Sequence, residues 1–206
     1  MEVSYEAVAE DQVAAVVTYL EMREPHAAPI PMSPLSLYRV EHPSLDHYRR
    51  LFRLVGAPWL WFSRLIMNDS KLAAIIHHAQ VELHIVLDEN GNECGMLELD
   101  FREPRECELA FVGLVQELSG KGHGRWLLAE ALRLAWREGI SRVHVHTCTL
   151  DHPAALSAYR RTGFTAYKRA IERFPDPRLL GILPLDCAPQ APVLGTDTSI
   201  EPRPES

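Results

Sequence analysis

The sequence predicts a mixed α/β (α+β) fold, and three observations lead to this prediction. Residues 81–116 form three alternating apolar and polar runs separated by turn residues, which is typical of an antiparallel meander. Residues 126–138 and 153–161 carry apolar side chains at the spacing of amphipathic helices. Strand-like runs at 142–149 and 164–174 alternate with these helices. One mixed central sheet with flanking helices accommodates all of these elements.

The meander is the clearest local signal. Its first two strands, 81–87 and 96–101, are separated by the turn residues of 88–92, which read DENGN. A second turn at 103–105 leads to the third strand, 106–116. Successive strands joined by short turns are antiparallel neighbours, so these three runs are expected to lie side by side in chain order.

The N-terminal residues give a less distinct pattern. Residues 2–8 are expected to form a short first strand. Residues 11–22 are expected to form a helix because their apolar side chains recur at helical spacing. The side chains that carry this spacing are Val13, Val16, Val17 and Leu20.

The segment 25–79 is expected to be largely helical after a proline-rich start. Four prolines between residues 25 and 34 interrupt any regular element, and 45–56 and 70–79 then have helical periodicity. Residues 58–62, which read PWLWF, connect the two helices. Large rings are usually buried in a core, and we expect this of at least one of the two tryptophans, although the rings could also line a substrate cavity.

Composition and charge exclude several classes of partner. Of the 206 residues, 47% are hydrophobic and 24% are charged, which suits one globular domain with extensions. The formal net charge is -7, and no long run of Lys or Arg occurs. Nucleic acid and anionic membrane surfaces are bound by clustered positive charge, so neither is an expected partner.

The cysteines and the first residues indicate the compartment. Cys94, Cys107, Cys148 and Cys187 lack the paired spacing of metal ligands and are too sparse for a secreted disulfide framework. The N-terminus is acidic where a signal peptide is basic, and no apolar run approaches the length of a membrane span. We therefore expect a cytoplasmic protein with reduced cysteines.

A glycine cluster follows the meander directly. Residues 120–125 read GKGHGR and lie between a predicted strand and a predicted helix. At this position, backbone amides and the partial positive charge of a helix N-terminus can hold a phosphate, and Lys121 and Arg125 add positive charge. Tight turns also collect glycine, so the cluster alone leaves both interpretations open.

Two other phosphate-binding folds fit the cluster less well. Lys121 is followed by Gly122 and not by Ser or Thr, which disfavours the P-loop of nucleotide hydrolases. The strands before the cluster look antiparallel, whereas a dinucleotide-binding fold needs a parallel strand–helix–strand unit. NAD is therefore not the expected cofactor.

Two motifs in order resemble the GNAT superfamily of N-acetyltransferases. Residues 114–124, LVQELSGKGHG, resemble its acetyl-CoA pyrophosphate loop, and 155–164, ALSAYRRTGF, resemble its Ala-x-x-x-Tyr-x-x-x-Gly-Phe helix ending. The resemblance extends over 81–174. It implies a GNAT fold with an antiparallel meander of the second, third and fourth strands, and a splay between the fourth and fifth strands.

The resemblance implies acetyl-CoA as cosubstrate and a set of residues that bind it. Ser119 stands where the family usually has Gln or Arg, and His152 stands where many members have Asn; a neutral histidine offers both a donor and an acceptor to the pantetheine arm. The implied cofactor-binding residues are Leu114, Val115, Gln116, Ser119, Gly120, Lys121, Gly122, His123, Gly124, Arg125 and His152.

The implied reaction is transfer of an acetyl group to a primary amine by direct attack in a ternary complex. An alkyl amine is mostly protonated at neutral pH, so a base must remove a proton, and Glu108 is the candidate. A solvated strand residue is the equally weighted alternative for Glu108. Tyr159 is the candidate acid for the departing thiolate. The resemblance also implies free amides at Leu114 and Gln116, with a bulge at Gly113.

The domain organisation follows from the same resemblance. Residues 1–186 are expected to form a single N-acetyltransferase domain, in which 25–79 shapes the acceptor site, and 187–206 a proline-rich, partly disordered tail. The acceptor is a small-molecule or peptide amine that the sequence does not identify. Homodimers are common in the family, so the resemblance makes a homodimer one possible assembly, which nothing in the sequence itself establishes.

Two other functions stay open at this point. Ser119 and His152 lend slight support to a non-catalytic acetyl-CoA-binding sensor or protein-interaction module. His144 and His146 share one face of a strand, and with His152 they could form a metal triad of a hydrolase. Histidines on strands more often pack or hydrogen-bond without metal, so no metal ligands are assigned.

Overall fold

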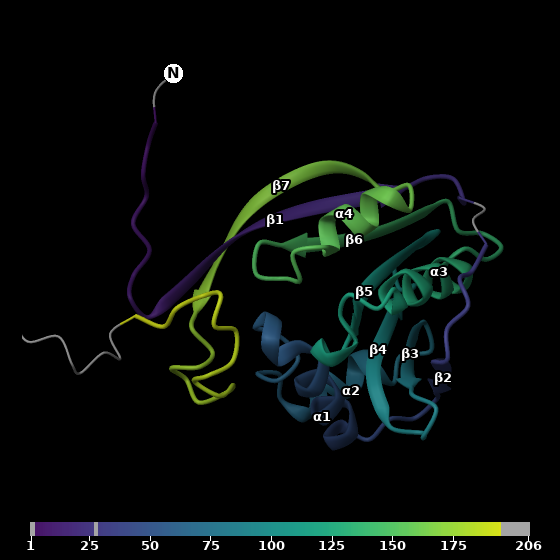
Figure 1. Cartoon of the computed structure of the whole chain (residues 1–206), viewed down its shortest axis with the longest axis horizontal. Helices are drawn as coiled ribbons and strands as arrows, with labels where there is room; N and C mark the ends of the chain where they lie inside the picture. The colour runs from purple at the N-terminus through teal and green to yellow at the C-terminus, as the bar shows by residue number, and fades with distance from the viewer. Residues whose placement is uncertain (1–2, 27–28, 195–206) are drawn as a thin grey trace, which may run out of the picture.

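Seven strands form one mixed sheet in the computed structural model, which describes residues 3–26 and 29–194 (Figure 1). The strand order is β2-β3-β4-β5-β6-β1-β7. The strands are β1 (Gln12–Met22), β2 (Ser36–Val40), β3 (Val81–Leu87), β4 (Glu93–Asp100), β5 (Glu106–Leu114), β6 (Arg142–Cys148) and β7 (Thr165–Pro175). This architecture confirms the predicted α/β class and the mixed sheet.

Helices cover the two faces of the sheet. The helices are α1 (Leu45–Gly56), α2 (Asp69–Ile76), α3 (His123–Ala135) and α4 (Ala155–Arg161), with short 3₁₀ turns η1 (Ala57–Trp59) and η2 (Gln116–Leu118). On one face, Tyr48 and Phe52 of α1 pack with Met96 of β4. On the other face, Leu127 and Ala131 of α3 belong to the largest buried cluster. Within the described residues, no helix is long and apolar enough to cross a membrane.

The meander has the predicted antiparallel pairing and continues over four strands, β2 to β5. At the β3–β4 turn, Asp88 Oδ1 accepts hydrogen bonds from the amides of Asn90 and Asn92. Gly91 in the same turn has φ +81°, a conformation that favours glycine. The turn chemistry therefore fixes the hairpin as the sequence predicted.

The predicted splay lies between β5 and β6. These strands pair in parallel over three residue pairs only, from Glu106 with Arg142 to Glu108 with His144. The sequence predicted the splay between the fourth and fifth strands. The labels are one higher here because the structure contains an additional strand, β2, that was not predicted. Beyond this short pairing the two strands part, and the gap opens between α3 and α4 (Figure 1).

The helix predicted for residues 11–22 is wrong, because Gln12–Met22 is strand β1. β1 lies between β6 and β7, and Val17 and Leu20, which point to opposite faces, are both buried. A strand buried on both faces has a nearly continuous apolar run, which includes the helical spacing by coincidence.

Three further details of the fold differ from the predictions. A strand was expected at residues 2–8; residue 2 lies outside the described residues, and 3–8 have no regular secondary structure. Ser36–Val40 forms the edge strand β2, which was not predicted because the prolines before it indicated an irregular segment. Helix α3 begins at His123 inside the glycine cluster and ends at Ala135, before the turn that contains Gly139.

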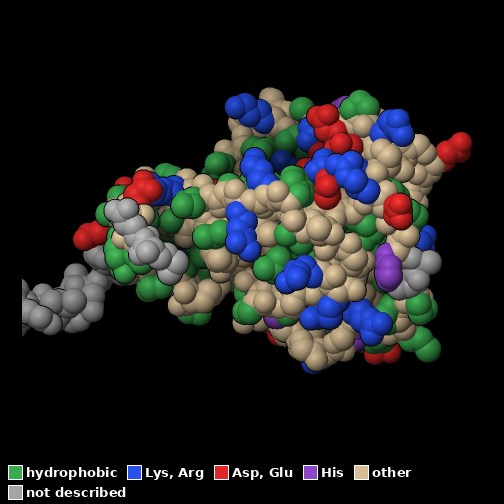
Figure 2. All heavy atoms as spheres, turned by 90° about the horizontal axis from the view of Figure 1, so that it is seen from above, with side chains coloured by type: hydrophobic (Ala, Val, Ile, Leu, Met, Phe, Trp, Pro, Cys, Tyr) green, Lys and Arg blue, Asp and Glu red, His purple; other side chains and the backbone are tan. Residues whose placement is uncertain are grey.

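β1 and β7 project beyond the body of the sheet, and the C-terminal segment folds beside them (Figure 1). In the space-filling view of Figure 2, the molecule narrows on its left side, where this projection lies in Figure 1. Asp176 and Arg178 form a buried ion pair with 2.7 Å between oxygen and nitrogen. Ala188 is buried, and Gln190 Nε2 donates to the carbonyl of Pro58 at 2.8 Å. The packed part of the chain therefore continues past residue 186, while 195–206 lie outside the described residues.

Candidate active site

A cavity of about 840 Å³ occupies the splay. Its walls come from β5, β6, β7, the N-terminus of α3, helix α4 and the connector that follows α1. Arg125 and Arg161 line it on the α3 and α4 side, and Trp59, Trp61 and Phe62 line it on the side of the connector. We call the side with Arg125 and Arg161 the phosphate-type end of the cavity, and the side with Trp59, Trp61 and Phe62 its aromatic end.

The glycine cluster shapes the phosphate-type end. Gly120 and Gly122 have φ +75° and +85°, and no atom lies within 4 Å of a Cβ added to either. Gly122 is the N-cap of α3 and offers no side-chain acceptor to the first turn. Uncapped amides at a helix N-terminus attract anions, and the open space above both glycines allows close approach. The loop geometry fits a pyrophosphate group.

One edge of β5 faces the splay with free backbone amides. The Val115 amide donates to the Cys94 carbonyl, on the β4 side. Successive amides of a strand point to opposite edges, so those of Val112 and Leu114 face the gap. The register shift of β5 against β4 skips Ala110, so the bulge lies there and the expectation at Gly113 is wrong.

Gly113 serves packing and not a bulge. A Cβ at this position would lie 2.8 Å from Val55 Cγ1 and 3.2 Å from Trp61 Cη2. Only glycine allows the ring of Trp61 to lie this close to β5. Gly56 has the same role on the other side, because a Cβ there would lie 2.5 Å from Trp61 Cβ.

Tyr159 stands in the wall of the cavity on α4 and is 8% exposed. Among the described residues, none forms a hydrogen bond with its hydroxyl. Burial, with a smaller contribution from the charge of Asp151, raises the pKa of this hydroxyl above its ordinary value. The phenol is therefore protonated at neutral pH and available as a proton donor.

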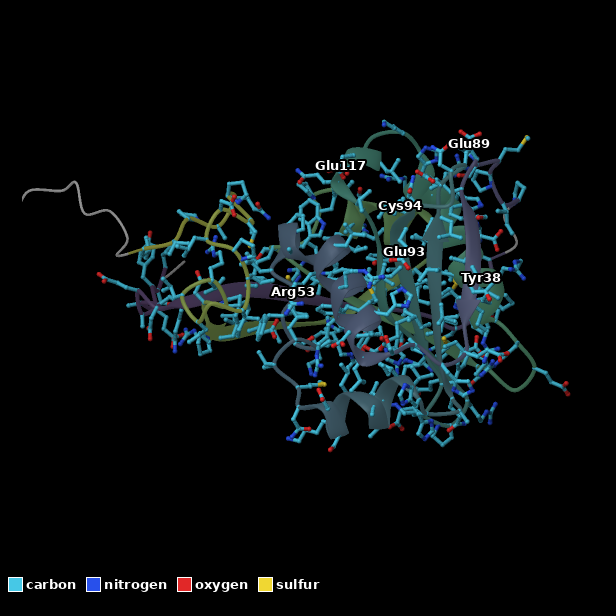
Figure 3. The ribbon with its side chains drawn as sticks, turned by 90° about the horizontal axis from the view of Figure 1, so that it is seen from below. Tyr38, Arg53, Glu89, Glu93, Cys94 and Glu117 are labelled. Carbon is cyan, nitrogen blue, oxygen red and sulfur yellow. The ribbon has the colours of Figure 1, made fainter. Side chains whose placement is uncertain are left out.

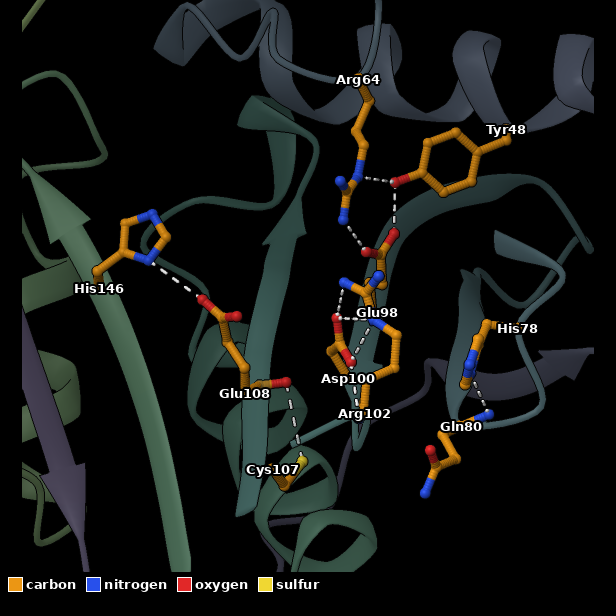
Figure 4. A network of polar contacts seen from close by, with 10 residues as sticks. All are labelled: Tyr48, Arg64, His78, Gln80, Glu98, Asp100, Arg102, Cys107, Glu108 and His146. Atoms are coloured by element: carbon orange, nitrogen blue, oxygen red, sulfur yellow. Dashed lines mark hydrogen bonds and ion pairs between the residues drawn. The ribbon is translucent and has the colours of Figure 1, made fainter. Parts of the chain in front are cut away.

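Glu108 and His146 form a pair where β5 and β6 part (Figure 4). His146 Nδ1 lies 3.4 Å from Glu108 Oε1. The hydrogen bond from His146 lowers the pKa of the Glu108 carboxyl, and the same bond raises the pKa of the imidazole. His146 lines the cavity, whereas Glu108 stands behind it. Sequence reasoning selected Glu108 and considered His146 only as a metal ligand.

Five rings form what we call the aromatic wall: Trp59, Trp61, Phe62, Phe111 and Phe174. Ring centroids lie 5.2 Å apart for Trp61 and Phe111, and 4.7 Å apart for Phe62 and Phe174. Trp59 stands edge-on to His152 at 5.2 Å. The wall draws on the connector, β5 and β7, so its members are distant in the chain.

Asp151 fixes the orientation of Trp61. Its Oδ1 accepts from Trp61 Nε1 at 3.2 Å, and its Oδ2 accepts from Thr147 Oγ1 and the Cys148 amide at 2.7 and 2.8 Å. These bonds occupy both carboxylate oxygens. The ring of Trp61 is thus held by a hydrogen bond at its nitrogen and by close packing of its carbon atoms against Gly56 and Gly113.

A buried polar triad anchors the connector to the sheet (Figure 4). Glu98 of β4 is fully buried, accepts from Tyr48 Oη, and pairs with Arg64 Nη2 at 2.6 Å. The guanidinium of Arg64 lies 5.2 Å from the centroid of the Phe111 ring. A buried carboxylate requires such partners. Because Arg64 closely follows Trp59, Trp61 and Phe62 in the chain, the triad holds this part of the connector against the sheet.

The structure brings many of the predicted site residues into the same cavity wall. These are Leu114, Ser119, Gly120, Gly122, Gly124, Arg125, His152 and Tyr159. The described residues that line the cavity do not include Glu108, Val115, Gln116, Lys121 or His123. His123 Nδ1 instead lies 3.2 Å from Ser33 Oγ.

His152 has a defined tautomer. Its Nδ1 accepts from the Ala154 amide at 3.1 Å, so Nε2 carries the hydrogen and is a donor. His144 lies 3.6 Å from Glu106 and points with His146 to one face of β6. Within the described residues, no group of three His, Cys, Asp or Glu side chains is placed to hold a metal ion.

The cavity wall includes residues that sequence reasoning missed. Val112 and Asp151 adjoin predicted positions, whereas Glu172 and Phe174 of β7 lie outside the two motifs. The only sequence pattern that indicated cavity-lining residues outside the motifs was the aromatic cluster of 58–62, for which lining a cavity was the alternative to burial in the core. Nothing local to Glu172 or Phe174 indicates a site, because β7 reaches the cavity through its pairing with β1.

The chain belongs to the acetyltransferase (GNAT) family, whose model matches residues 46–164, more than half of its length. This match includes the glycine cluster, the splay and Tyr159. No curated protein sequence matches the chain.

Solved structures support the same fold. A GCN5-related N-acetyltransferase from Sphaerobacter thermophilus aligns with a TM-score of 0.55 and 16% identity, over 78% of this chain and 51% of that one. The chain thus spans about half of that relative. An aminoglycoside acetyltransferase from an uncultured soil metagenomic sample aligns with a TM-score of 0.53 and 20% identity, over 68% and 93% of the two chains.

A further structural relative is a spermidine N-acetyltransferase from Vibrio cholerae. It aligns with a TM-score of 0.50 and 20% identity, over 71% of this chain and 96% of that one. At these identities the likeness shows the fold alone. The acceptor of the present protein therefore has to be inferred from its own cavity.

Proposed function

We propose that the protein transfers the acetyl group of acetyl-CoA to a primary amine by direct attack in a ternary complex. The observation that carries this proposal is one continuous cavity that contains the open glycine loop, the free edge of β5 and the hydroxyl of Tyr159. A cosubstrate and an acceptor can meet in such a cavity without a covalent enzyme intermediate.

The proposed cosubstrate site uses mainly backbone groups. The loop around Gly120 and Gly122 and the first turn of α3 would hold the pyrophosphate, with Arg125 adding positive charge. The amides of Val112 and Leu114 would bind along the splay, and His152 Nε2 would donate to the pantetheine arm. Ser119 lacks a cationic or amide side chain, and the backbone groups compensate for it.

We assign the base to the pair of His146 and Glu108. His146 lines the cavity, and its Nδ1 faces Glu108, which leaves Nε2 of the neutral ring to accept the proton of the amine. The Glu108 carboxylate then stabilises the imidazolium that forms. This assignment retains the predicted role of Glu108 but moves proton acceptance to the residue that reaches the cavity.

We assign the acid to Tyr159. The amine nitrogen forms a bond to the acetyl carbon, the bond between that carbon and sulfur breaks, and the Tyr159 hydroxyl supplies the proton that sulfur gains. Burial holds the pKa of this hydroxyl high, so the proton is present at neutral pH when the thiolate departs.

Calorimetric titration with acetyl-CoA, followed by a CoA control, tests the proposal. We expect binding near micromolar affinity, and then CoA release when a panel of primary amines is added. Binding without turnover for any amine would favour a sensor or interaction module. No binding of either thioester or CoA would contradict the proposed cosubstrate site.

A further inference from the structure

The acceptor end of the cavity is defined by the aromatic wall. Phe174 is buried and the other four rings are partly buried, and ring centroids lie 5.2 Å apart for Trp61 and Phe111 and 4.7 Å apart for Phe62 and Phe174. Trp61 and Phe111 pack against the cluster that contains α1, whereas α3 packs in a separate cluster on the other face of the sheet.

The wall is held in place before any ligand binds. Trp61 is fixed by Gly56, Gly113 and Asp151, and Phe111 lies under the guanidinium of Arg64. Phe174 and Phe62 adjoin a buried cluster that includes Leu60 and Leu183. A preformed apolar surface binds a rigid apolar ligand without a further ordering cost.

The charges of the cavity are separated between its two ends. Its Arg side chains, Arg125 and Arg161, belong to α3 and α4. Its acids are Asp151, whose oxygens are occupied by Trp61, Thr147 and Cys148, and Glu172 of β7. Among the described residues, none forms an ion pair or hydrogen bond with the Glu172 carboxylate. The aromatic end thus offers one free carboxylate.

We propose that the acceptor is a primary monoamine that carries an aromatic or bulky apolar group and no carboxylate; this inference rests on the proposed acetyl transfer. The apolar group would pack on the aromatic wall, and the ammonium would be attracted by Glu172 and by the ring faces. The further ammonium groups of a polyamine would lie unpaired against the rings. The carboxylate of an amino acid would face Glu172 without a cation to bind it.

Steady-state acetylation of three amines tests the acceptor class. We expect kcat/KM for 2-phenylethylamine to exceed that for spermidine and for phenylalanine by at least tenfold. A preference for spermidine or phenylalanine, with acetyl-CoA binding intact, would overturn the acceptor inference and leave the acetyl-transfer proposal standing. Failure to bind acetyl-CoA in calorimetry would overturn both proposals.

Two substitutions locate the binding surface. Phe62→Leu keeps an apolar side chain but removes the ring, and we expect KM for 2-phenylethylamine to rise at least fivefold. Glu172→Gln removes the charge on an exposed strand position where folding should be unaffected, and we expect a similar rise. Both variants should bind acetyl-CoA within twofold of the unmodified protein.

Matched controls distinguish this surface from general damage. Glu130→Gln removes a carboxylate of α3 outside this cavity, and Tyr38→Leu removes an exposed ring of β2. Neither control should change KM for 2-phenylethylamine. An unchanged KM in both Phe62→Leu and Glu172→Gln would show that the amine binds elsewhere.

Discussion

The two ends of the cavity are built in different ways. The phosphate-type end comes mainly from one contiguous stretch, Leu114 to Arg125, with Arg161 added by α4, and depends on backbone amides and on two glycines with positive φ. The aromatic end brings together side chains of the connector, β5 and β7, which are separated by up to about half of the chain. One end is thus a local backbone structure, and the other is a product of long-range packing.

This difference teaches where specificity can vary within the fold. A backbone cradle does not depend on side chains, so the proposed cosubstrate site should tolerate Ser119 in place of the family's usual Gln or Arg. The aromatic wall depends on support by buried groups such as Glu98 and Arg64. Changes at the two ends should therefore have separable effects, and four experiments test this separation, from the largest expected effect to the smallest.

The largest effect is expected from Glu98→Gln, which breaks the support of the aromatic end. Arg64 would lose its buried counter-charge, and we expect the free energy of unfolding to fall by about 3 kcal/mol. Chemical denaturation measures this loss. The control is Glu130→Gln, because the Glu130–Arg133 pair lies at the surface and should contribute less than about 1 kcal/mol. Equal losses in the two variants would contradict the anchoring role of Glu98.

The next effect concerns the junction of the two ends. Tyr159→Phe removes the proposed proton donor, and we expect kcat to fall by about a hundredfold. The Kd for acetyl-CoA should stay within twofold, because the ring still packs in the wall. Tyr38→Phe on edge strand β2 (Figure 3), where Tyr38 is 60% exposed, is the matched control and should leave kcat unchanged. Full activity of Tyr159→Phe would refute the acid assignment.

Gly122→Val tests the backbone cradle. It places a β-branched side chain at φ +85° in open space beside the proposed pyrophosphate, and we expect Kd for acetyl-CoA to rise about tenfold. Gly91→Val is matched in backbone conformation, with φ +81° and no atom within 4 Å of an added Cβ. Both should lower the Tm, but only Gly122→Val should weaken binding. A normal Kd in Gly122→Val would show that the loop is not the cosubstrate site.

The smallest effect is a shift in pH dependence. If neutral His146 accepts the proton, kcat/KM should rise with pH through the His146 pKa, which Glu108 holds above its usual 6.5. Glu108→Gln removes that interaction, so the acidic limb should move to lower pH with activity retained. If Glu108 were itself the base, its lowered pKa would place the limb below 4.5, and Glu108→Gln would abolish turnover.

Much of the fold followed from local sequence patterns. The DENGN turn and the helix from 45 to 56 depend on contacts close in the chain and appear where they were expected, and the helix after the glycine cluster is present but begins three residues early, at His123. Strand β1 was not predicted, because its apolar run fits a helix as well as a strand. Its pairing with β6 and β7 on either side makes it a strand. Strand pairing at long range overrides such an ambiguity.

The candidate site divides in the same manner. The sequence by itself predicted the glycine loop, and its motifs proposed Tyr159 and Glu108 as candidates, because amide cradles and motif spacing are properties of contiguous residues. Only the tertiary structure decided that His146 faces the cavity before Glu108, and that Phe174 and Glu172 join the connector in one wall. The physical reason is that side-chain proximity across a sheet depends on register and on strand order, which no short segment encodes.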